Sequence, residues 1–359
     1  MKMNKLISQF FVLSLLFLAS CSSDDDGGSN PEESKGAYDN GILISGEGSG
    51  AGTGSISYVS DDLTISENLI YKKVNSTELG VYVQSVAFDD DSAFIIVDNA
   101  NTITVVDRYT FEYEGEISTG LSTPRFMVVD GDTGYVTNWG DPSNDSDDFI
   151  AVVNLNSNAV VETIPVGNGP ERIVENNGKL YVSHKGAYST NNIISVIDTD
   201  DDSVEEITVK DNPDELFINS VGDLMVLSEG NTIYDADWNV VGQTAASIST
   251  IDTSSNAVVE ELVFADGNSP SLMVLDGSTV YFALNNEIYA MNESASNLPS
   301  ASLLEAEGFM YAFAVDSDRI YATDTSFSDV SKLNIYDLDT QEKLDTKEVA
   351  LGAAKIYFN

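Results

Sequence analysis

The chain has 359 residues, of which 59 are acidic and 16 basic, and its formal net charge at pH 7 is −43. A negative field of this size repels nucleic acid and anionic lipid headgroups, which disfavours nucleic-acid binding and direct membrane binding. Hydrophobic residues make up 42% of the sequence, which argues against disorder and allows a large core, in one all-β domain or in two smaller domains.

Residues 1–20 have the features of a signal peptide. Lys2 and Lys5 give it a basic start, and an apolar run over residues 10–19 is too short to span a membrane. The segment leads into Leu-Ala-Ser-Cys at residues 18–21, which resembles the lipobox of bacterial lipoproteins. In that family the cysteine is acylated and becomes the new N-terminus, so the resemblance implies that Cys21 is lipidated. Cys21 is the only cysteine, so no intramolecular disulfide explains it.

Residues 21–37 are polar, acidic and rich in glycine and serine, which predicts a flexible tether. Acidic residues directly after an acylated cysteine resemble the export signal that sends lipoproteins to the outer surface in some didermal bacteria. The resemblance implies an outer-membrane protein that faces the exterior and touches the membrane only through its lipid anchor. The folded body is then expected over residues 38–359.

A repeat of forty-odd residues organises the body of the chain. Three stretches align, over residues 124–138, 170–184 and 270–284. In each, a proline precedes a short apolar strand, an Asp-Gly or Asn-Gly turn follows, and a second strand carries a tyrosine. These dipeptides suit a hairpin because their central residues tolerate positive φ. Two further strands follow in most units, as at residues 248–252 and 257–262, and four short strands at this period indicate a β-propeller blade.

Seven candidate first strands fix the expected number of blades. They begin near Val83, Arg125, Glu171, Asp214, Ser271, Tyr311 and Ala353. The last of them ends the chain, whereas residues 41–45 read as a second strand that lacks a first. We therefore predict an all-β, seven-bladed propeller with four-stranded blades, closed by the C-terminal strand joining the N-terminal blade. Six or eight blades stay open, because the unit over residues 214–269 is longer than the others.

The segment Tyr-Val-Thr-Asn at residues 135–138 resembles the motif that names the YVTN β-propeller repeat family. A degenerate copy, Tyr-Val-Ser-His, occupies residues 181–184. The resemblance implies the propeller fold over nearly the whole body. It does not imply a function, because propellers host many unrelated activities.

Signatures of catalysis and metal binding are scarce. The single histidine excludes a conventional two-His metal site, and the glycine-rich residues 46–54 lack the spacing of a nucleotide-binding loop. Acidic runs at residues 89–91, 145–148 and 198–202 offer oxygen ligands to Ca²⁺, but none matches an EF-hand loop and Asp is common in turns. We predict a protein that is not an enzyme and has no metal cofactor, with Ca²⁺ as the one candidate ion.

Propeller geometry, by analogy with other propellers, gathers the loops entering each first strand and leaving each second strand on one face around the central channel. Two of the four arginines and the only histidine fall at these positions. The candidate ligand-binding residues are Tyr82, Arg125, Trp139, Arg172, His184, Lys185, Tyr188 and Tyr311. Aromatic rings would supply contact area, and arginine bidentate hydrogen bonds, to a ligand with anionic or polar groups.

An alternative interpretation gives the same residues a structural role. Arg125 and Arg172 would then neutralise carboxylates such as Glu171 and Glu215, and Trp139 would cap a loop. Trp238, in the overlong unit, either extends the candidate face or covers a blade edge.

Three hypotheses of function remain. The first is a surface lipoprotein that captures a small-molecule nutrient and passes it to an outer-membrane transporter. The architecture resembles lipoprotein propellers that capture cobalamin, which implies a corrinoid as one candidate ligand, beside glycans and haem, and a TonB-dependent transporter as partner. The second is a protein-interaction or adhesion scaffold without a small-molecule site. The third, a lyase or hydrolase, has the least support because no acid–base pair stands out.

Overall fold

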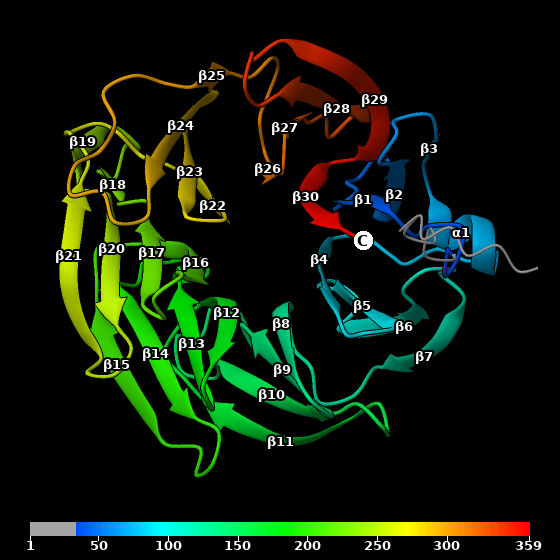
Figure 1. The fold of residues 1–359 in the computed structure, drawn as a ribbon. Coiled ribbons are helices and arrows are strands. Elements are labelled where there is room, and N and C mark those ends of the chain that lie inside the picture. The colour runs from blue at the N-terminus through cyan, green and yellow to red at the C-terminus, as the bar shows by residue number, and fades with distance from the viewer. Residues whose placement is uncertain (1–33) are drawn as a thin grey trace, which may run out of the picture. The chain divides into compact units, whose positions relative to one another are not determined.

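Residues 34–359 are described by the structure, a computed structural model, and they fold into seven four-stranded antiparallel sheets arranged as a ring (Figure 1). A separate two-stranded hairpin and one short helix complete this part of the chain. The prediction of an all-β, seven-bladed propeller is therefore confirmed. The signal peptide, Cys21 and most of the expected tether lie outside the described residues.

Each blade runs from an innermost strand at the central channel to an outermost strand at the rim (Figure 1). The innermost strands are β30 (Ala353–Phe358), β4 (Val83–Phe88), β8 (Pro124–Asp130), β12 (Pro170–Asn176), β16 (Pro213–Ile218), β22 (Leu272–Asp276) and β26 (Phe313–Asp316). The second strands are β1 (Gly41–Gly46), β5 (Ser92–Val97), β9 (Thr133–Asn138), β13 (Lys179–His184), β17 (Leu224–Ser228), β23 (Thr279–Leu284) and β27 (Arg319–Asp324).

The two outer strands of each blade follow in the same order around the ring. The third strands are β2 (Ser55–Ser60), β6 (Thr102–Asp107), β10 (Phe149–Asn154), β14 (Ile193–Asp198), β20 (Ser247–Asp252), β24 (Glu287–Asn292) and β28 (Val330–Asp337). The outermost strands are β3 (Ser66–Glu67), β7 (Tyr113–Ile117), β11 (Ala159–Pro165), β15 (Val204–Thr208), β21 (Ala257–Val263), β25 (Leu304–Glu305) and β29 (Lys343–Leu351).

The last strand closes the ring, as the sequence predicts. β30 pairs antiparallel with β1, with Ile356 opposite Ile44, so the red end of the chain lies beside its blue beginning (Figure 1). Beyond the paired strands, the backbones of Asn359 and Gly41 exchange two hydrogen bonds, of 2.8 and 3.3 Å. Closure gives β1 an inner partner, and β30 takes the innermost position beside the channel that β4, β8, β12, β16, β22 and β26 hold in the other blades.

The overlong unit contains an insertion and not an eighth blade. Between β17 and β20 the chain forms the hairpin of β18 (Thr232–Tyr234) and β19 (Val240–Gln243), which belongs to no blade. The helix α1 (Ile70–Asn75) is a second insertion, between the first two blades, and it buries Ile70 and Tyr71. No helix within residues 34–359 is long and apolar enough to cross a membrane.

Apolar side chains fill the spaces between neighbouring blades. Between the sheets that contain β5 and β9, for example, Phe94, Ile103, Val136 and Val153 form one buried cluster. Because each blade packs against a neighbour on both faces, its central strands are apolar on both faces, as in the run Ile95-Ile96-Val97. The packing leaves the channel at the centre of the ring to be lined by the innermost strands.

Deleting residues 353–359 should destabilise the propeller strongly, because β1 loses its inner partner and the first blade becomes three-stranded. A loss of several kcal/mol would lower the Tm by roughly 10 °C or more in a body of this size. The control replaces residues 232–243 of the inserted hairpin with a Gly-Gly turn between Asn231 and Thr244, and should change the Tm little. Thermal denaturation followed by circular dichroism compares the two; equal Tm values would contradict the role given to β30.

Candidate functional site

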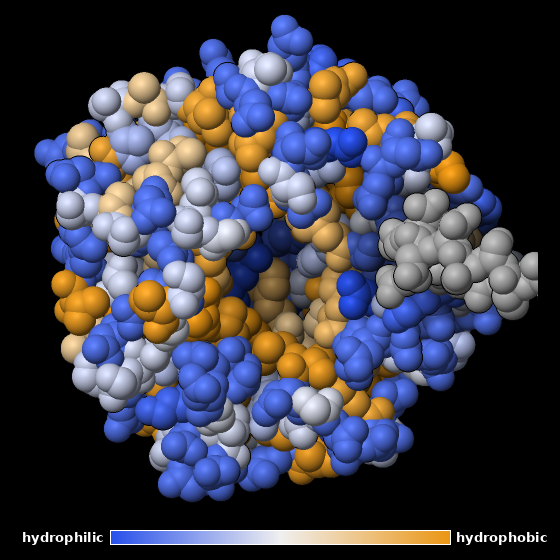
Figure 2. All heavy atoms as spheres, in the orientation of Figure 1, coloured by the Kyte–Doolittle hydropathy of each residue, from blue (hydrophilic) through white to orange (hydrophobic). Residues whose placement is uncertain are grey.

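A cavity of about 440 Å³ occupies the centre of the ring. Small-molecule sites in proteins span roughly 300–1,000 Å³, so the cavity is large enough for a small organic ligand. Figure 2 shows a hollow at the centre of the ring, with apolar residues along the lower and right parts of its rim and hydrophilic residues deeper inside. The lining residues are Glu47, Gln84, Arg125, Trp139, Glu171, Arg172, Lys185, Ala187, Ser189, Asn212, Asp214, Glu229, Ser271, Leu272, Met310, Tyr311 and Lys355.

β-Bulges at the start of the innermost strands supply half of the charged lining. The register of pairing shifts after Val83 in β4, Pro124 in β8, Pro170 in β12 and Pro213 in β16. A bulge adds a residue and turns its side chain out of the normal alternation, and proline fits beside it because no ladder donor is needed there. The residues in or next to these bulges are Gln84, Arg125, Glu171, Arg172, Asp214 and Glu215.

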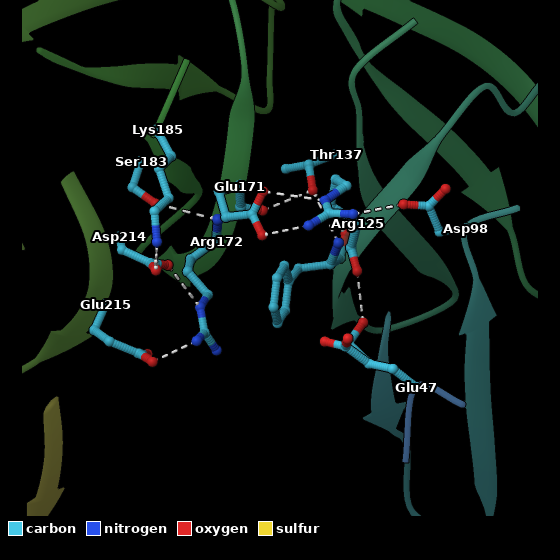
Figure 3. A network of polar contacts seen from close by, with 12 residues as sticks. Glu47, Asp98, Arg125, Thr137, Glu171, Arg172, Ser183, Lys185, Asp214 and Glu215 are labelled. Carbon is cyan, nitrogen blue, oxygen red and sulfur yellow. Dashed lines mark hydrogen bonds and ion pairs between the residues drawn. The ribbon is translucent and has the colours of Figure 1, made fainter. Parts of the chain in front are cut away.

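Hydroxyl groups on the second strands hold two of the bulges in place. The Thr137 Oγ1 accepts a hydrogen bond from the backbone N–H of Phe126 at 2.9 Å. Ser183 occupies the equivalent position in the next blade, and its Oγ accepts from the backbone N–H of Arg172 at 3.1 Å (Figure 3). The charged side chains of the cavity are therefore carried by backbone that is fixed before any ligand binds.

Arg125 is held by two carboxylates and one aromatic ring. Its Nε and Nη2 donate to the two carboxylate oxygens of Glu171 at 3.1 and 3.0 Å, and its Nη1 pairs with Asp98 (Figure 3). The guanidinium carbon lies 3.8 Å from the centre of the Trp139 ring. The Arg125 and Glu171 side chains are only 12% and 7% exposed, so this is a buried ion pair with a cation–π contact.

Arg172 and Lys185 form a second network with three carboxylates. The Arg172 Nε donates to Asp214 at 3.1 Å, and its Nη2 donates to Glu215 (Figure 3). The Lys185 Nζ donates to Asp214 at 2.7 Å and to Glu229 at 3.0 Å. The pairing of Arg125 and Arg172 with Glu171 and Glu215, considered from the sequence as an alternative, is thus present, and both arginines also line the cavity or its wall.

The network shifts the pKa values of its carboxyl groups in opposite directions. Burial raises the pKa of Glu215 and of Glu229 to about 7. Burial would also raise the pKa of Asp214, but the Lys185 and Arg172 charges outweigh it and hold that pKa well below its usual range. Near neutral pH, Asp214 is therefore negatively charged, whereas Glu215 and Glu229 are each protonated in a fraction of the molecules.

Tyr311, Glu47 and Lys355 line the remaining part of the cavity wall. The Tyr311 hydroxyl donates to Glu47 at 3.4 Å, and burial, followed by the Glu47 charge, raises the pKa of Tyr311 to about 12. The Lys355 Nζ lies 5.9 Å from the centre of the Tyr311 ring and makes no hydrogen bond or ion pair within residues 34–359. Burial, followed by the Arg172 charge, lowers the pKa of Lys355.

Five of the eight sequence-predicted residues come together at this cavity, namely Arg125, Trp139, Arg172, Lys185 and Tyr311. Tyr82 and Tyr188 do not line it. They are 47% and 79% exposed, and Tyr188 lies beside the cavity wall, with its ring centre 6.5 Å from that of Trp139. Trp238 is 82% exposed and packs against Tyr234 in the inserted hairpin, so it neither lines the cavity nor covers a blade edge.

The expectation that His184 contacts a ligand is corrected by the structure. The side chain is fully buried, and its two ring nitrogens lie 2.8 Å from the Ser195 Oγ and 3.2 Å from the Asn168 carbonyl oxygen. Burial lowers its pKa to about 4. Successive residues of a strand point to opposite faces, so Lys185 lies in the cavity wall while His184 stays inside the protein.

Four lining or supporting carboxylates are not among the predicted ligand-binding residues: Glu47, Asp98, Asp214 and Glu229. Asp98 and Glu229 directly follow the second strands β5 and β17, and Asp214 follows Pro213 as Arg125 follows Pro124. Arg125 and Arg172 were predicted because residues that enter a first strand or leave a second strand gather around the channel. The same rule applies to Asp98, Asp214 and Glu229. Glu47 lies in the glycine-rich segment, where the sequence indicated only an inter-strand loop.

Acidic turns elsewhere in residues 34–359 do not gather into an ion site. No group of three or more His, Cys, Asp or Glu side chains in this part of the chain could hold a metal ion. In the most acidic run, the Asp198 and Asp201 carboxylates accept hydrogen bonds from backbone N–H groups two residues ahead, at 3.0 Å each. This is the usual local role of Asp in turns.

Comparison with known proteins places the chain in a family. The domain of unknown function DUF5074 matches residues 40–220, from β1 to just beyond β16. The chain belongs to this family. No curated protein matches the chain. The family's description names no activity, and the resemblance to the YVTN repeat stays a prediction from the motif.

Three solved structures are similar to the propeller. Hydrazine synthase of Kuenenia stuttgartiensis is 21% identical, with a TM-score of 0.59 over 75% of this chain and 87% of that chain. The computationally designed Ika8 protein is 10% identical, with a TM-score of 0.58 over 90% and 89%. Dihydro-heme d1 dehydrogenase NirN in complex with DHE is 13% identical, with a TM-score of 0.56 over 91% and 77%. At these identities the likeness shows the fold alone.

The raised pKa values predict how stability depends on pH. Between the ordinary glutamate pKa of about 4.5 and the folded-state value of about 7, the folded protein binds more protons at Glu215 and Glu229 than the unfolded chain does. The free energy of unfolding should therefore fall as pH rises from about 5 to about 8.

Glu229→Gln should make this fall shallower, because the amide has no proton to lose. Glu342→Gln, at an exposed turn, removes the same formal charge and should leave the slope unchanged. Urea denaturation at several pH values measures the slopes. If Glu229→Gln and Glu342→Gln gave the same slope, the assignment of the titration to the cavity would be wrong.

Proposed function

We propose that the protein is a binding protein that captures a small polar molecule in the cavity at the centre of its propeller. The observation that carries this proposal is the concentration of cations there. Four of the chain's 16 lysines and arginines line one cavity in a protein of net charge −43. Since lysine and arginine are scarce in the rest of the chain, their placement on the walls of the channel is better explained by recognition of a ligand than by a contribution to solubility.

The lining offers both hydrogen-bond donors and acceptors to a ligand. Arg172 and Lys355 present N–H groups, Glu47 and Glu229 present carboxylate oxygens, and Trp139 presents an aromatic surface. Most of the cations are already compensated by carboxylates, so the cavity is suited to a polar organic molecule and not to a highly charged anion. A few convergent polar groups beside apolar contact area are typical of small-molecule sites.

Cobalamin-like molecules, haem and sugars are the candidate ligands that we carry over from the sequence. A ligand too large for the cavity would rest on its opening, beside which Tyr82 and Tyr188 are exposed. We propose binding without catalysis. Carboxyl groups with a pKa of about 7 are also a feature of active sites, but Glu215 and Glu229 are each bound by a cation of the network.

We further propose that the propeller is held at the outer surface of the cell by a lipid on Cys21 and delivers its ligand to an outer-membrane transporter of the TonB-dependent class. The support is the sequence alone: the lipobox-like residues 18–21 and the acidic residues that follow them.

Replacing Cys21 with alanine tests the anchor. If Cys21 is acylated, the wild-type protein expressed in a didermal host fractionates with membranes and incorporates labelled palmitate, and Cys21→Ala loses both properties while the folded body is unchanged. Protease added to intact cells should degrade the wild-type propeller if it faces outward. A Cys21→Ala protein that stays in the membrane fraction would contradict the lipid anchor.

A ligand screen on the soluble body, residues 34–359, tests capture. The panel contains cobalamins, haem, oligosaccharides, small organic acids and Ca²⁺, and thermal shift followed by calorimetry measures binding. We expect one class to raise the Tm, and the Trp139→Ala variant to weaken its binding at least about tenfold, because a buried aromatic contact is worth on the order of 1.4 kcal/mol or more.

The chain offers a matched control, because Trp238 is its only other tryptophan. Trp238→Ala should bind as the wild type does. A Trp238→Phe variant leaves Trp139 as the only indole, so its fluorescence should change when the cavity is filled. Binding that survives Trp139→Ala but is lost in Trp238→Ala would place the ligand elsewhere and contradict the proposal.

The second candidate function, a protein-interaction scaffold, is favoured by the inserted hairpin. Tyr234, Trp238, Val240 and Val241 are all more than half exposed on this one small element. Clustered exposed apolar side chains of this kind often mark a protein contact. If no compound in the panel binds, this surface becomes the better-supported functional site.

A further inference from the structure

The ammonium group of Lys355 is the one lysine or arginine head group of the cavity lining that no carboxylate neutralises directly. Arg125, Arg172 and Lys185 each pair with at least two carboxylates. The Lys355 Nζ has no carboxylate oxygen within 4.0 Å among residues 34–359, and its nearest aromatic ring centres, of Phe126 and Tyr311, are both 5.9 Å away. A half-buried charge without a partner costs free energy that a ligand anion would recover.

Arg172 presents a second donor to the same space. Its Nε is used by Asp214 and its Nη2 by Glu215, whereas its Nη1 makes no hydrogen bond within the described part of the chain. Arg172 and Lys355 both line the main cavity, and among the charges around Lys355 the Arg172 guanidinium has the largest effect on its pKa, which it lowers. The two N–H-bearing groups therefore face a common volume.

This volume is the junction with a second, mainly apolar chamber. The inner chamber has a volume of about 170 Å³ and shares Arg172, Leu272 and Lys355 with the main cavity. The rest of its wall is largely apolar and includes Val86, Phe126, Val274, Phe313 and Ile356. An anion-binding pair thus lies at the entrance of a pocket that suits a hydrocarbon or aromatic group.

We infer that Lys355 and Arg172 bind the carboxylate of a small organic acid whose apolar group occupies the inner chamber. This inference rests on the proposed function and specifies the class of ligand that the cavity accepts. The carboxylate accepts hydrogen bonds from the Lys355 Nζ and the Arg172 Nη1. These are the two cationic nitrogen atoms of the cavity lining that the protein's own ion pairs do not use.

A singly charged group fits this junction better than a phosphate. Asp214 lines the main cavity and Glu215 lines the inner chamber, each paired with Arg172, and Glu47 is close enough for the Lys355 charge to influence its pKa. These carboxylates repel a second negative charge on the ligand. Glu47 and Glu229 can instead accept hydrogen bonds from a hydroxyl or amino group of the same acid.

Matched small ligands test the inference on the folded body. Phenylacetate carries both features, phenylacetamide lacks the charge, and acetate lacks the apolar group. Calorimetry should show phenylacetate binding at least about tenfold more tightly than either analogue, because the amide loses the charge-assisted hydrogen bonds and acetate loses the contacts in the inner chamber. Lys355→Met should abolish the preference for the acid over the amide, Lys355→Arg should keep it, and Lys72→Met on the surface helix α1 should not change it.

The stability of the ligand-free variant supplies an independent measurement. If Lys355 has no structural partner, Lys355→Met keeps or raises the Tm. If Lys355 serves instead as a counter-charge for Glu47 and Glu215, the same variant lowers the Tm, and the inference is overturned. Equal affinity for phenylacetate and phenylacetamide overturns it as well.

The outcome also separates this inference from the function on which it rests. Binding of a sugar or corrinoid that depends on Trp139, with no preference for organic acids and no effect of Lys355→Met, would refute the carboxylate site and leave capture in the central cavity standing. Absence of binding by every compound, with unchanged Trp139 fluorescence, would count against both.

Discussion

The antiparallel pairing of β30 with β1 holds the first blade together and, through it, the ring. It joins the two ends of a body more than 300 residues long, with Ile356 opposite Ile44. Both strands also place residues at the cavity: Lys355 lies on β30, and Glu47 directly follows β1. The contact that closes the propeller therefore also completes the wall of the candidate site. A change that separates β30 from β1 would disrupt both the fold and the site.

Charge compensation is the second constraint on the channel. Burying a guanidinium or an ammonium is costly unless carboxylates and hydrogen bonds compensate it. Arg125, Arg172 and Lys185 meet this requirement with carboxylates from neighbouring blades, which ties adjacent blades together at their inner ends. The same pairs fix the side chains in place and leave few free donors. The cavity is rigid as a result, and Lys355 is the main charge available to a ligand.

Much of the fold was predictable because it depends on local signals that recur. Proline before an apolar strand and Asn-Gly or Asp-Gly after it mark the inner hairpin of a blade, and the unmatched strand at each end of the body predicts closure. The inserted hairpin interrupts that recurrence, since its sequence has no counterpart in the other blades. It showed in the sequence only as excess length between Asp214 and Ser269.

The candidate site was predictable in position but not in detail. Arg125 and Arg172 stood out by their scarcity and their place after proline. The acids that bind them did not stand out, because Asp and Glu are common throughout the chain. His184 was misassigned although the repeat contained the signal: it aligns with Asn138, which is also buried, with its amide donating to the Val136 carbonyl. The last residue of this motif is structural in both blades.

A crystal structure of residues 34–359 with a bound compound would decide whether the central cavity captures a ligand. We expect electron density for the ligand inside the ring, in contact with Trp139 on one side and with Lys355 or Arg172 on the other. A ligand bound instead at the inserted hairpin, beside Trp238, with the channel side chains making only their own ion pairs, would contradict it.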